Sequence, residues 1–249
     1  MSELWRVAGK ATERFSARAL AYDRYRPRYP ASVFDDIMLS AGLGAGAEVM
    51  EIGSGTGIAT GPLVDRGLNV TAIEPSRTLT TVAKSKTDNR VRFIDRRFEE
   101  CSTESPVRLL VAFNAWHWVE QPFGTGLAAQ LLQPGGTLAL VWTEVVQWGQ
   151  PPFEERLAGV FGRVWNKRED LVDRSLQPVR QAPAFGQLGV HHHLFERTLD
   201  AATFVAVTQT YGVDHTAEQY RQIEEIIDRE FGGAITKTED AILYLAGRR

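Results

Sequence analysis

Val49-Met50-Glu51-Ile52-Gly53-Ser54-Gly55-Thr56-Gly57 is the stretch of sequence that decides the fold. It begins with a short run typical of a buried strand, continues into a turn with three glycines and leads into a helical pattern. Glycine permits positive φ, and it has no Cβ atom that would obstruct a nucleoside or an amino-acid group lying against the turn. The stretch therefore predicts a ligand site at the end of a buried strand.

The spacing of these glycines distinguishes between classes of nucleotide-binding protein. The dinucleotide fingerprint needs its third glycine where this chain has Ile58, so an NAD- or FAD-dependent oxidoreductase is disfavoured. Glu74 stands 17 residues after Gly57, ends the next strand-like run and is followed by Pro75. A carboxylate at that place can accept hydrogen bonds from both hydroxyls of a ribose.

Outward from the glycine turn, short β-rich runs alternate with helical stretches from residue 48 to residue 142. This alternation predicts right-handed βαβ units and a mostly parallel sheet. Ser76 is expected to cap the helix after the second strand, and Pro134-Gly135-Gly136 to lead into the fifth strand. The predicted strands of this part are Glu48–Ile52, Asn69–Ile73, Val91–Ile94, Leu109–Phe113 and Thr137–Trp142.

The two ends of the chain give weaker patterns. Before the sheet, Pro30 is expected in the first turn of a helix over Val33–Ala41 that the stretch Gly42–Gly46 ends. After Trp142, a stretch interrupted by Pro and Gly reaches Gly189 without a predicted element beyond its first helix. The elements expected in this C-terminal part are a helix at Phe153–Trp165, a strand at Val190–Arg197, helices at Ala201–Tyr211 and Glu218–Phe231, and a last strand at Ala241–Ala246.

Composition limits the classes of function. The chain has 249 residues, 43% of them hydrophobic, and a net charge of -3, which fits one α/β domain without the positive field that attracts nucleic acid or an anionic membrane. Its apolar runs are too short to cross a bilayer, and charges interrupt residues 1–28, so no signal core is expected. A single cysteine, Cys101, cannot form an internal disulfide. These features predict a cytoplasmic protein, and they leave open whether it is a monomer or a homodimer.

Residues 1–30 differ from the rest of the chain in charge. Seven Lys and Arg residues stand there against three acidic residues, a net charge of +4. One interpretation is a solvated amphipathic helix, and the other is an arm that attracts carboxylates to a site.

Taken together, the glycine turn, Glu74 and Pro134-Gly135-Gly136 resemble the class I S-adenosylmethionine-dependent methyltransferases over residues 48–142. A narrower likeness, to trans-aconitate-type small-molecule methyltransferases, extends it to the phrase Ala115-Trp116-His117-Trp118 and to the stretch Thr198–Arg249. At the N-terminus the same subgroup is similar at Phe15, Tyr22, Arg26, Pro27, Tyr29 and Pro30.

The resemblance implies a fold, a domain plan and a cofactor. The fold is a seven-stranded, mostly parallel sheet with an antiparallel last strand and a helical cap. Residues 1–249 form one domain, with a lid at 1–45, a cofactor-binding core at 46–145, and cap helices and C-terminal strands at 146–249. The cofactor is S-adenosylmethionine, and the product is S-adenosylhomocysteine. Its implied contacts are Tyr22, Arg26, Glu51, Gly53, Ser54, Gly55, Gly57, Glu74, Pro75, Arg97, Phe98, Asn114 and Ala115.

The chain departs from the family pattern at two places. Arg108 precedes Leu109 where the family usually has Asp opening the fourth strand, and Arg97 stands where Asp or Ser often meets the adenine amino group. Phe98 can stack on the adenine ring and offer it a backbone N–H, or it can be a plain core aromatic.

Methyl transfer from a sulfonium is an in-line displacement, so the resemblance implies an enzyme that works mostly by alignment. A carboxylate acceptor needs no base at neutral pH, whereas a hydroxyl or amine acceptor usually does. His117 is the candidate base, or else a hydrogen-bonded wall residue. Arg26 or Arg28 can clamp the methionine carboxylate or an acid group of the substrate.

Trp116 and Trp118 can form one side of an acceptor pocket, or they can pack in the core. Plant salicylate-type and insect juvenile hormone acid methyltransferases carry a similar His-Trp phrase, in which the indole N–H holds the substrate carboxylate. By that resemblance the role falls on Trp118. The implied substrate-binding residues are Trp116, Trp118, Arg28 and Tyr29.

His191-His192-His193 are consecutive on a predicted strand and point to alternate faces, so we expect no metal site. The sequence predicts an O-methyltransferase acting on a small organic acid or a hydroxylated metabolite. The alternatives are a nitrogen or carbon acceptor and a non-catalytic S-adenosylmethionine-binding protein. A nucleic-acid substrate is disfavoured, because Asn114-Ala115-Trp116-His117 stands where such enzymes carry a phrase like Asn-Pro-Pro-Tyr.

Overall fold

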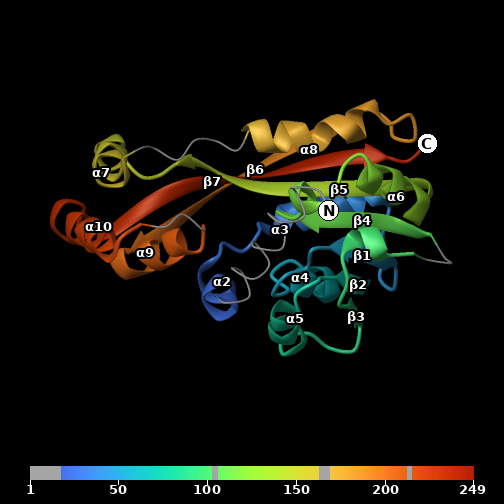
Figure 1. The fold of residues 1–249 in the computed structure, drawn as a ribbon, viewed down its shortest axis with the longest axis horizontal. Helices are drawn as coiled ribbons and strands as arrows, with labels where there is room; N and C mark the ends of the chain where they lie inside the picture. Colours follow the sequence, from blue (N-terminus) through green and yellow to red (C-terminus); the bar gives the residue numbers. More distant parts are fainter. Residues whose placement is uncertain (1–17, 103–105, 163–168, 212–214) are drawn as a thin grey trace.

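The computed structural model describes residues 18–102, 106–162, 169–211 and 215–249. Its centre is a seven-stranded sheet of order β3-β2-β1-β4-β5-β7-β6 (Figure 1). Strands β1 to β5 pair in parallel, and β7 is antiparallel to both of its neighbours, β5 and β6. The predicted fold class, a mostly parallel sheet with an antiparallel last strand, is confirmed.

The strands that have their predicted length depend on local sequence, whereas the strands that are longer than predicted depend on pairing with distant parts of the chain. The first three strands have the predicted bounds, and each apolar run ends at a glycine or an acidic residue. The last three extend beyond prediction, since antiparallel pairing continues through polar residues past Trp142. The strands are β1 Glu48–Ile52, β2 Asn69–Ile73, β3 Val91–Ile94, β4 Val107–Phe113, β5 Leu132–Gln147, β6 Gly189–Asp200 and β7 Ala234–Gly247.

Local capping explains several helix ends. The Ser76 hydroxyl accepts a hydrogen bond from the Leu79 N–H at 3.3 Å, which confirms the predicted cap. Pro30 is the N-cap of its helix and not part of the first turn, and Gly42 ends that helix with φ 58°. The helices are α2 Ala19–Tyr25, α3 Ala31–Ala41, α4 Thr60–Asp65, α5 Arg77–Lys84, α6 Phe123–Leu131, α7 Pro151–Phe161, α8 Glu169–Gln181, α9 Ala201–Gln209 and α10 Ala217–Glu230, with 3-10 turns η1 Phe98–Glu100 and η2 Trp116–Trp118.

Helix α8 lies in the stretch interrupted by Pro and Gly, for which the sequence predicts no helix, and it contains Pro178. The proline lies within the helix, where it removes a backbone donor. Val172, Leu176 and Val179 recur at helical spacing and are buried against the sheet, so packing offsets the cost of the proline. The end of the helix predicted at Phe153–Trp165 lies outside the described residues.

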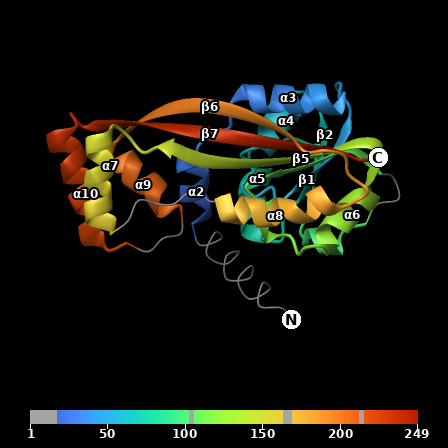
Figure 2. The same cartoon turned by 90° about the horizontal axis from the view of Figure 1, so that it is seen from above.

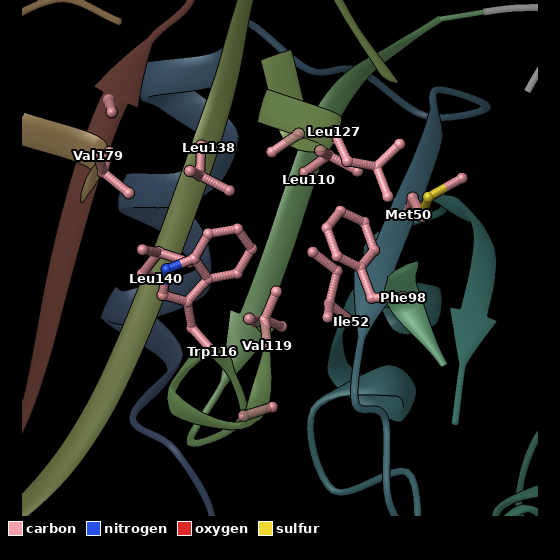
Figure 3. Close-up of a cluster of buried hydrophobic side chains, with 14 of the residues drawn as sticks. Met50, Ile52, Phe98, Leu110, Trp116, Val119, Leu127, Leu138, Leu140 and Val179 are labelled. Atoms are coloured by element: carbon pink, nitrogen blue, oxygen red, sulfur yellow. The ribbon is translucent and has the colours of Figure 1, made fainter. Parts of the chain in front are cut away.

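The sheet is covered on both faces, and strand alternation assigns each side chain to its face. Leu109 and Val111 of β4 join the cluster under α3 and α4, whereas Leu110 joins the opposite cluster, which includes residues of α6 and α8. Figure 3 shows part of the second cluster, with Trp116 beside Leu140. A third cluster joins α7, α9 and α10 to the far ends of β6 and β7, and Figure 2 shows these helices at one end of the molecule.

One boundary of the predicted domain plan, at residue 145, falls inside a strand. Strand β5 runs through residue 145, and β6 and β7 belong to the same sheet as β1. The C-terminal part therefore supplies helices and two of the seven strands of the sheet. Of the predicted lid, residues 1–17 lie outside the described residues. No helix in the described part of the chain is long and apolar enough to span a bilayer.

Trp116 provides a test of the packing. Its side chain is 0% exposed, and its indole N–H donates to the Ser175 carbonyl at 3.3 Å. We expect Trp116→Ala to lower the free energy of unfolding in urea by about 3–5 kcal/mol, because it leaves a large cavity and an unpaired carbonyl. Trp118 is 39% exposed, so Trp118→Ala should cost less than about 1 kcal/mol. Equal losses in the two variants would contradict the difference in burial.

Candidate functional site

The three glycines after β1 have positive φ values of 68°, 56° and 81° at Gly53, Gly55 and Gly57. A Cβ atom on Gly53 would lie 2.5 Å from the Cβ of Ala115, and one on Gly57 would lie 3.1 Å from the Cβ of Ala83. A Cβ atom on Gly55 would have no heavy atom within 4 Å. The first and third glycines therefore make room for other parts of the protein, and Gly55 is the one that leaves open space for a ligand.

Glu74, at the end of β2, holds this loop in place. One carboxylate oxygen accepts from the Gly55 N–H at 3.0 Å, and the other accepts from the Ser76 N–H at 2.9 Å. The side chain is buried, which raises its pKa above the ordinary value, and the two backbone N–H groups oppose that rise. Because each carboxylate oxygen has two lone pairs, both can accept a further hydrogen bond from a ligand.

Glu51 lies behind the loop and does not line the pocket. It is 1% exposed and accepts a hydrogen bond from the Thr60 hydroxyl at 2.6 Å. Burial raises its pKa to about 7; the hydrogen bond from Thr60 opposes this shift, and the charge of Glu74 adds to it. Glu51 thus stabilises the end of β1 behind the loop, and its predicted contact with the cofactor would have to be indirect.

A pocket opens beside the loop at the carboxyl ends of β1, β2 and β4. It is open to solvent, and its volume is about 880 Å³ with the open mouth included. Ligands of open α/β sheets bind at this edge. Of the residues predicted to contact the cofactor, those that line the pocket are Tyr22, Gly53, Gly55, Glu74, Pro75, Arg97, Phe98, Asn114 and Ala115.

Four residues predicted to contact the cofactor do not line this pocket, namely Glu51, Ser54, Gly57 and Arg26. Other residues that line the pocket were not predicted from the sequence. Most of the missed residues are apolar strand and helix ends that carry no chemical signal by themselves, and their position beside the glycine turn follows from the sheet order. They are Ile52, Ile73, Leu79, Glu99, Phe113 and Val119.

Asn114 holds one side of the pocket in an unusual backbone conformation. Its φ is 50°, a region that Asn tolerates better than most residues. The side-chain oxygen accepts from the Thr143 N–H at 3.0 Å, and the side-chain N–H₂ donates to the Tyr29 hydroxyl at 2.9 Å. Tyr29 lies behind Asn114, and burial raises the pKa of its phenol. The predicted substrate-binding role of Tyr29 would therefore act through Asn114.

The two tryptophans around His117 have different surroundings. Trp116 is a core residue, so its predicted place in an acceptor pocket is wrong: its ring is fully buried and packs on Phe98, with ring centroids 5.9 Å apart. Trp118 is partly exposed and lines the pocket. The 3-10 turn directs consecutive side chains to different sides.

His117 lies next to Trp118, with ring centroids 4.7 Å apart, but does not line the pocket. Its Nδ1 accepts a hydrogen bond from the indole N–H of Trp142 at 3.3 Å. In the neutral imidazole this bond places the proton on Nε2. With that tautomer Nε2 is a donor, which opposes the predicted role of His117 as a general base.

Arg26 and Arg28, near the N-terminus of the described chain, also have different surroundings. Arg28 is exposed, donates to the Asp23 carbonyl and does not line the pocket, so its contact with substrate stays a prediction. The guanidinium of Arg26 stands between two aromatic rings, 5.0 Å from the centroid of Tyr22 and 4.4 Å from that of Tyr211. Since Tyr22 lines the pocket, Arg26 lies directly behind the pocket wall.

The three consecutive histidines alternate between the faces of β6, as expected. Nδ1 of His191 lies 2.9 Å from Asp36, and Nε2 of His193 lies 3.5 Å from the same carboxylate. His192 pairs with Asp240 on the other face. Among the described residues, no group of three or more His, Cys, Asp or Glu side chains is arranged to hold a metal ion.

A family model described as a methyltransferase domain matches residues 49–136. An uncharacterised methyltransferase of Mycobacterium tuberculosis is 33% identical over 128 residues, which are 51% of this chain and 51% of that protein. The chain thus spans about half the length of the first curated relatives that it matches. These matches support a methyltransferase, and the segment matched by the family model includes the glycine turn and Glu74.

Solved structures agree on the fold. A protein of Anaeromyxobacter dehalogenans, described as a type II methyltransferase, has a TM-score of 0.65 at 20% identity and covers 90% of this chain and 98% of its own. A methyltransferase of Thiobacillus denitrificans in complex with S-adenosylhomocysteine has a TM-score of 0.53 at 19% identity and covers 92% of this chain and 96% of its own. The chain has the class I methyltransferase fold.

The buried carboxylate of Glu51 gives a test by pH. Between about 4.5, the ordinary pKa of Glu, and about 7, the folded chain keeps a proton that the unfolded chain loses, so this group lowers stability as pH rises through that window. Glu51→Gln removes the titration and keeps an oxygen for Thr60. From pH 5 to pH 8, the stability of the variant relative to the parent protein should rise by about 2–3 kcal/mol in urea unfolding. A difference that stays constant over this range would show that Glu51 ionises normally.

Proposed function

We propose that this chain is an S-adenosylmethionine-dependent methyltransferase that acts on a small molecule carrying a carboxylate. The observation that supports it most is the pocket beside Gly55, closed by a Glu74 carboxylate with lone pairs available, within the segment that matches a methyltransferase domain. The S-adenosylhomocysteine bound to a protein of the same fold supports the choice of cofactor. The narrower likeness to trans-aconitate-type enzymes is part of this proposal.

The residues around the pocket fit such a cofactor. The absent side chain at Gly55 leaves open space on the wall, and Glu74 offers acceptors for the two hydroxyls of a ribose. Phe98 is 3% exposed and lines the pocket, so one ring serves both the core and the ligand wall. Arg97 lines the same wall and stands where the family often has an acidic residue.

When bound, the cofactor would supply an electrophilic methyl group on a sulfonium. The chain's own residues then have to align an acceptor and exclude water. Among the described residues that line the pocket, the carboxylates are Glu74, which holds the loop, and Glu99, which accepts from the Glu120 N–H at 2.7 Å. With His117 held as a donor, an acceptor that is already ionised at neutral pH fits best. A carboxylate meets that condition.

Trp118 is the residue that would orient this carboxylate. It lines the pocket and is 39% exposed, and an indole N–H can donate to an anionic oxygen. A hydroxyl acceptor is the second candidate, and it would require a base. A non-catalytic cofactor-binding protein would keep the cofactor contacts and lack the acceptor contacts.

The cofactor site is tested by isothermal titration with S-adenosylhomocysteine. Gly55→Ala adds a methyl group at the open wall and at a φ of 56°, and we expect at least tenfold weaker binding. Glu74→Gln should weaken binding about 10- to 100-fold, because an amide cannot accept on both of its polar atoms. Gly61→Ala is the matched control, since the added methyl group meets open space within α4. Equal affinity in Gly55→Ala and Gly61→Ala would place the cofactor elsewhere.

The acceptor chemistry is tested with labelled S-adenosylmethionine and a panel of small carboxylic acids and phenols. For a carboxylate acceptor, His117→Gln should lower kcat less than about tenfold, because no proton has to be removed. Trp118→Phe keeps the ring but removes the N–H, so it should mainly raise KM. A loss of kcat of about 10² to 10⁴ in His117→Gln, with methylation of phenols, would establish base catalysis and overturn the carboxylate. Cofactor binding without methylation of any acceptor would favour the non-catalytic alternative.

A further inference from the structure

Strand β6 is a long edge of the sheet that pairs on one side only. Within the described residues it pairs with β7 over all 12 of its residues, from Gly189 to Asp200, and no other strand lies on its outer side. Figure 1 shows β6 on the opposite side of the sheet from β3. An edge of this length presents a row of backbone donors and acceptors with which another strand can pair.

Natural sheets usually protect their edges against such pairing, by short strands, by Lys or Pro, or by a bulge. The other edge of this sheet, β3, is protected in this way, because it has only 4 residues and carries an exposed arginine, Arg92. Strand β6 contains neither Lys nor Pro, and its register with β7 runs without a bulge. The contrast between the two edges indicates that β6 is available for pairing.

One face of β6 is exposed to solvent from end to end. Side chains alternate between the faces of a strand, and the five on this face, Val190, His192, Leu194, Glu196 and Thr198, are all exposed. The two apolar side chains among them, Val190 and Leu194, are 48% and 65% exposed. Pairing with another strand would remove part of this apolar surface from water, which is favourable.

The sequence of this exposed face is complementary to itself in the antiparallel direction. With Leu194 on a twofold axis, Leu194 faces Leu194 of a second copy, and His192 faces Glu196 of the second copy. Nδ1 of His192 contacts Asp240 at 2.6 Å, and the ring can donate from Nε2 to the second copy's carboxylate when it is protonated. Apolar pairs and pairs of opposite charge stabilise antiparallel strands.

Other registers of the same pairing are less favourable. A shift by two residues is the smallest that keeps every side chain on its own face. Such a shift places Leu194 opposite Glu196 in one direction and opposite His192 in the other. Either shift sets an apolar side chain against a polar one, so the register centred on Leu194 fits best.

We propose that this chain forms a homodimer in which the β6 strands of two copies pair antiparallel about a twofold axis at Leu194. The contact is isologous, since each copy contributes the same surface, and the assembly therefore closes at two copies. The interface is one strand edge from each copy, so we expect a weak dimer with a Kd in the micromolar range. The pocket at β1, β2 and β4 is separated from this edge by β5 and β7, so dimerisation does not depend on the proposed function.

The test is sedimentation equilibrium of the full chain at about 1–300 μM, where the parent protein should dimerise. Leu194→Lys and Leu194→Glu should each weaken the dimer at least tenfold, because like charges then face each other across the axis. An equimolar mixture of the two variants should dimerise at least tenfold more tightly than either variant alone, since a lysine then faces a glutamate. Phe123→Lys changes a side chain of α6 that is 57% exposed; it is the control and should keep the parent's Kd within twofold.

The variants at Leu194 should fold like the parent protein, because the side chain is exposed. Their far-ultraviolet circular dichroism and their midpoint of urea unfolding check this. A parent protein that stays monomeric at the highest concentration would overturn the dimer. A dimer that persists in both Leu194 variants, or two monomeric variants that do not associate when mixed, would overturn the pairing of β6 about Leu194.

Discussion

The carboxylate of Glu74 is the constraint on which the ligand site depends. It joins the ends of β1 and β2 by accepting from Gly55 and Ser76 while it is almost fully buried. The same interaction fixes a positive-φ glycine in the loop and orders the start of α5. A neutral side chain of similar size could not accept from two opposed backbone N–H groups and a ligand at once. Glu74 therefore determines both the geometry of the loop and the hydrogen-bond acceptors that the pocket offers to a ligand.

The local part of the fold could be predicted from sequence. The apolar runs of β1 to β3 end at a glycine or an acidic residue, and Ser76, Gly42 and the glycine turn act through neighbouring backbone. The extensions of β5 to β7 could not be predicted, because polar residues there are held by antiparallel partners far along the chain. Helix α8 was missed for a related reason, since sheet packing offsets Pro178.

In the candidate site, too, local features could be predicted from the sequence and features that depend on distant contacts could not. Residues of the glycine turn and the strand end after it were predicted to lie at a ligand site, and Gly55 and Glu74 line the pocket. Trp116 and Trp118 could not be told apart, because one turn sends similar side chains to the core and to the pocket.

The most direct measurement of the central claim is a crystal structure of the chain with S-adenosylhomocysteine. We expect both ribose hydroxyls within hydrogen-bond distance of the Glu74 carboxylate, about 2.5–3.0 Å between oxygens, with the Gly55 N–H still bonded to Glu74. We also expect the ligand to lie against the open face of Gly55. A ribose bound away from Glu74, or a loop that releases Glu74 when the ligand binds, would refute the proposed role of Glu74.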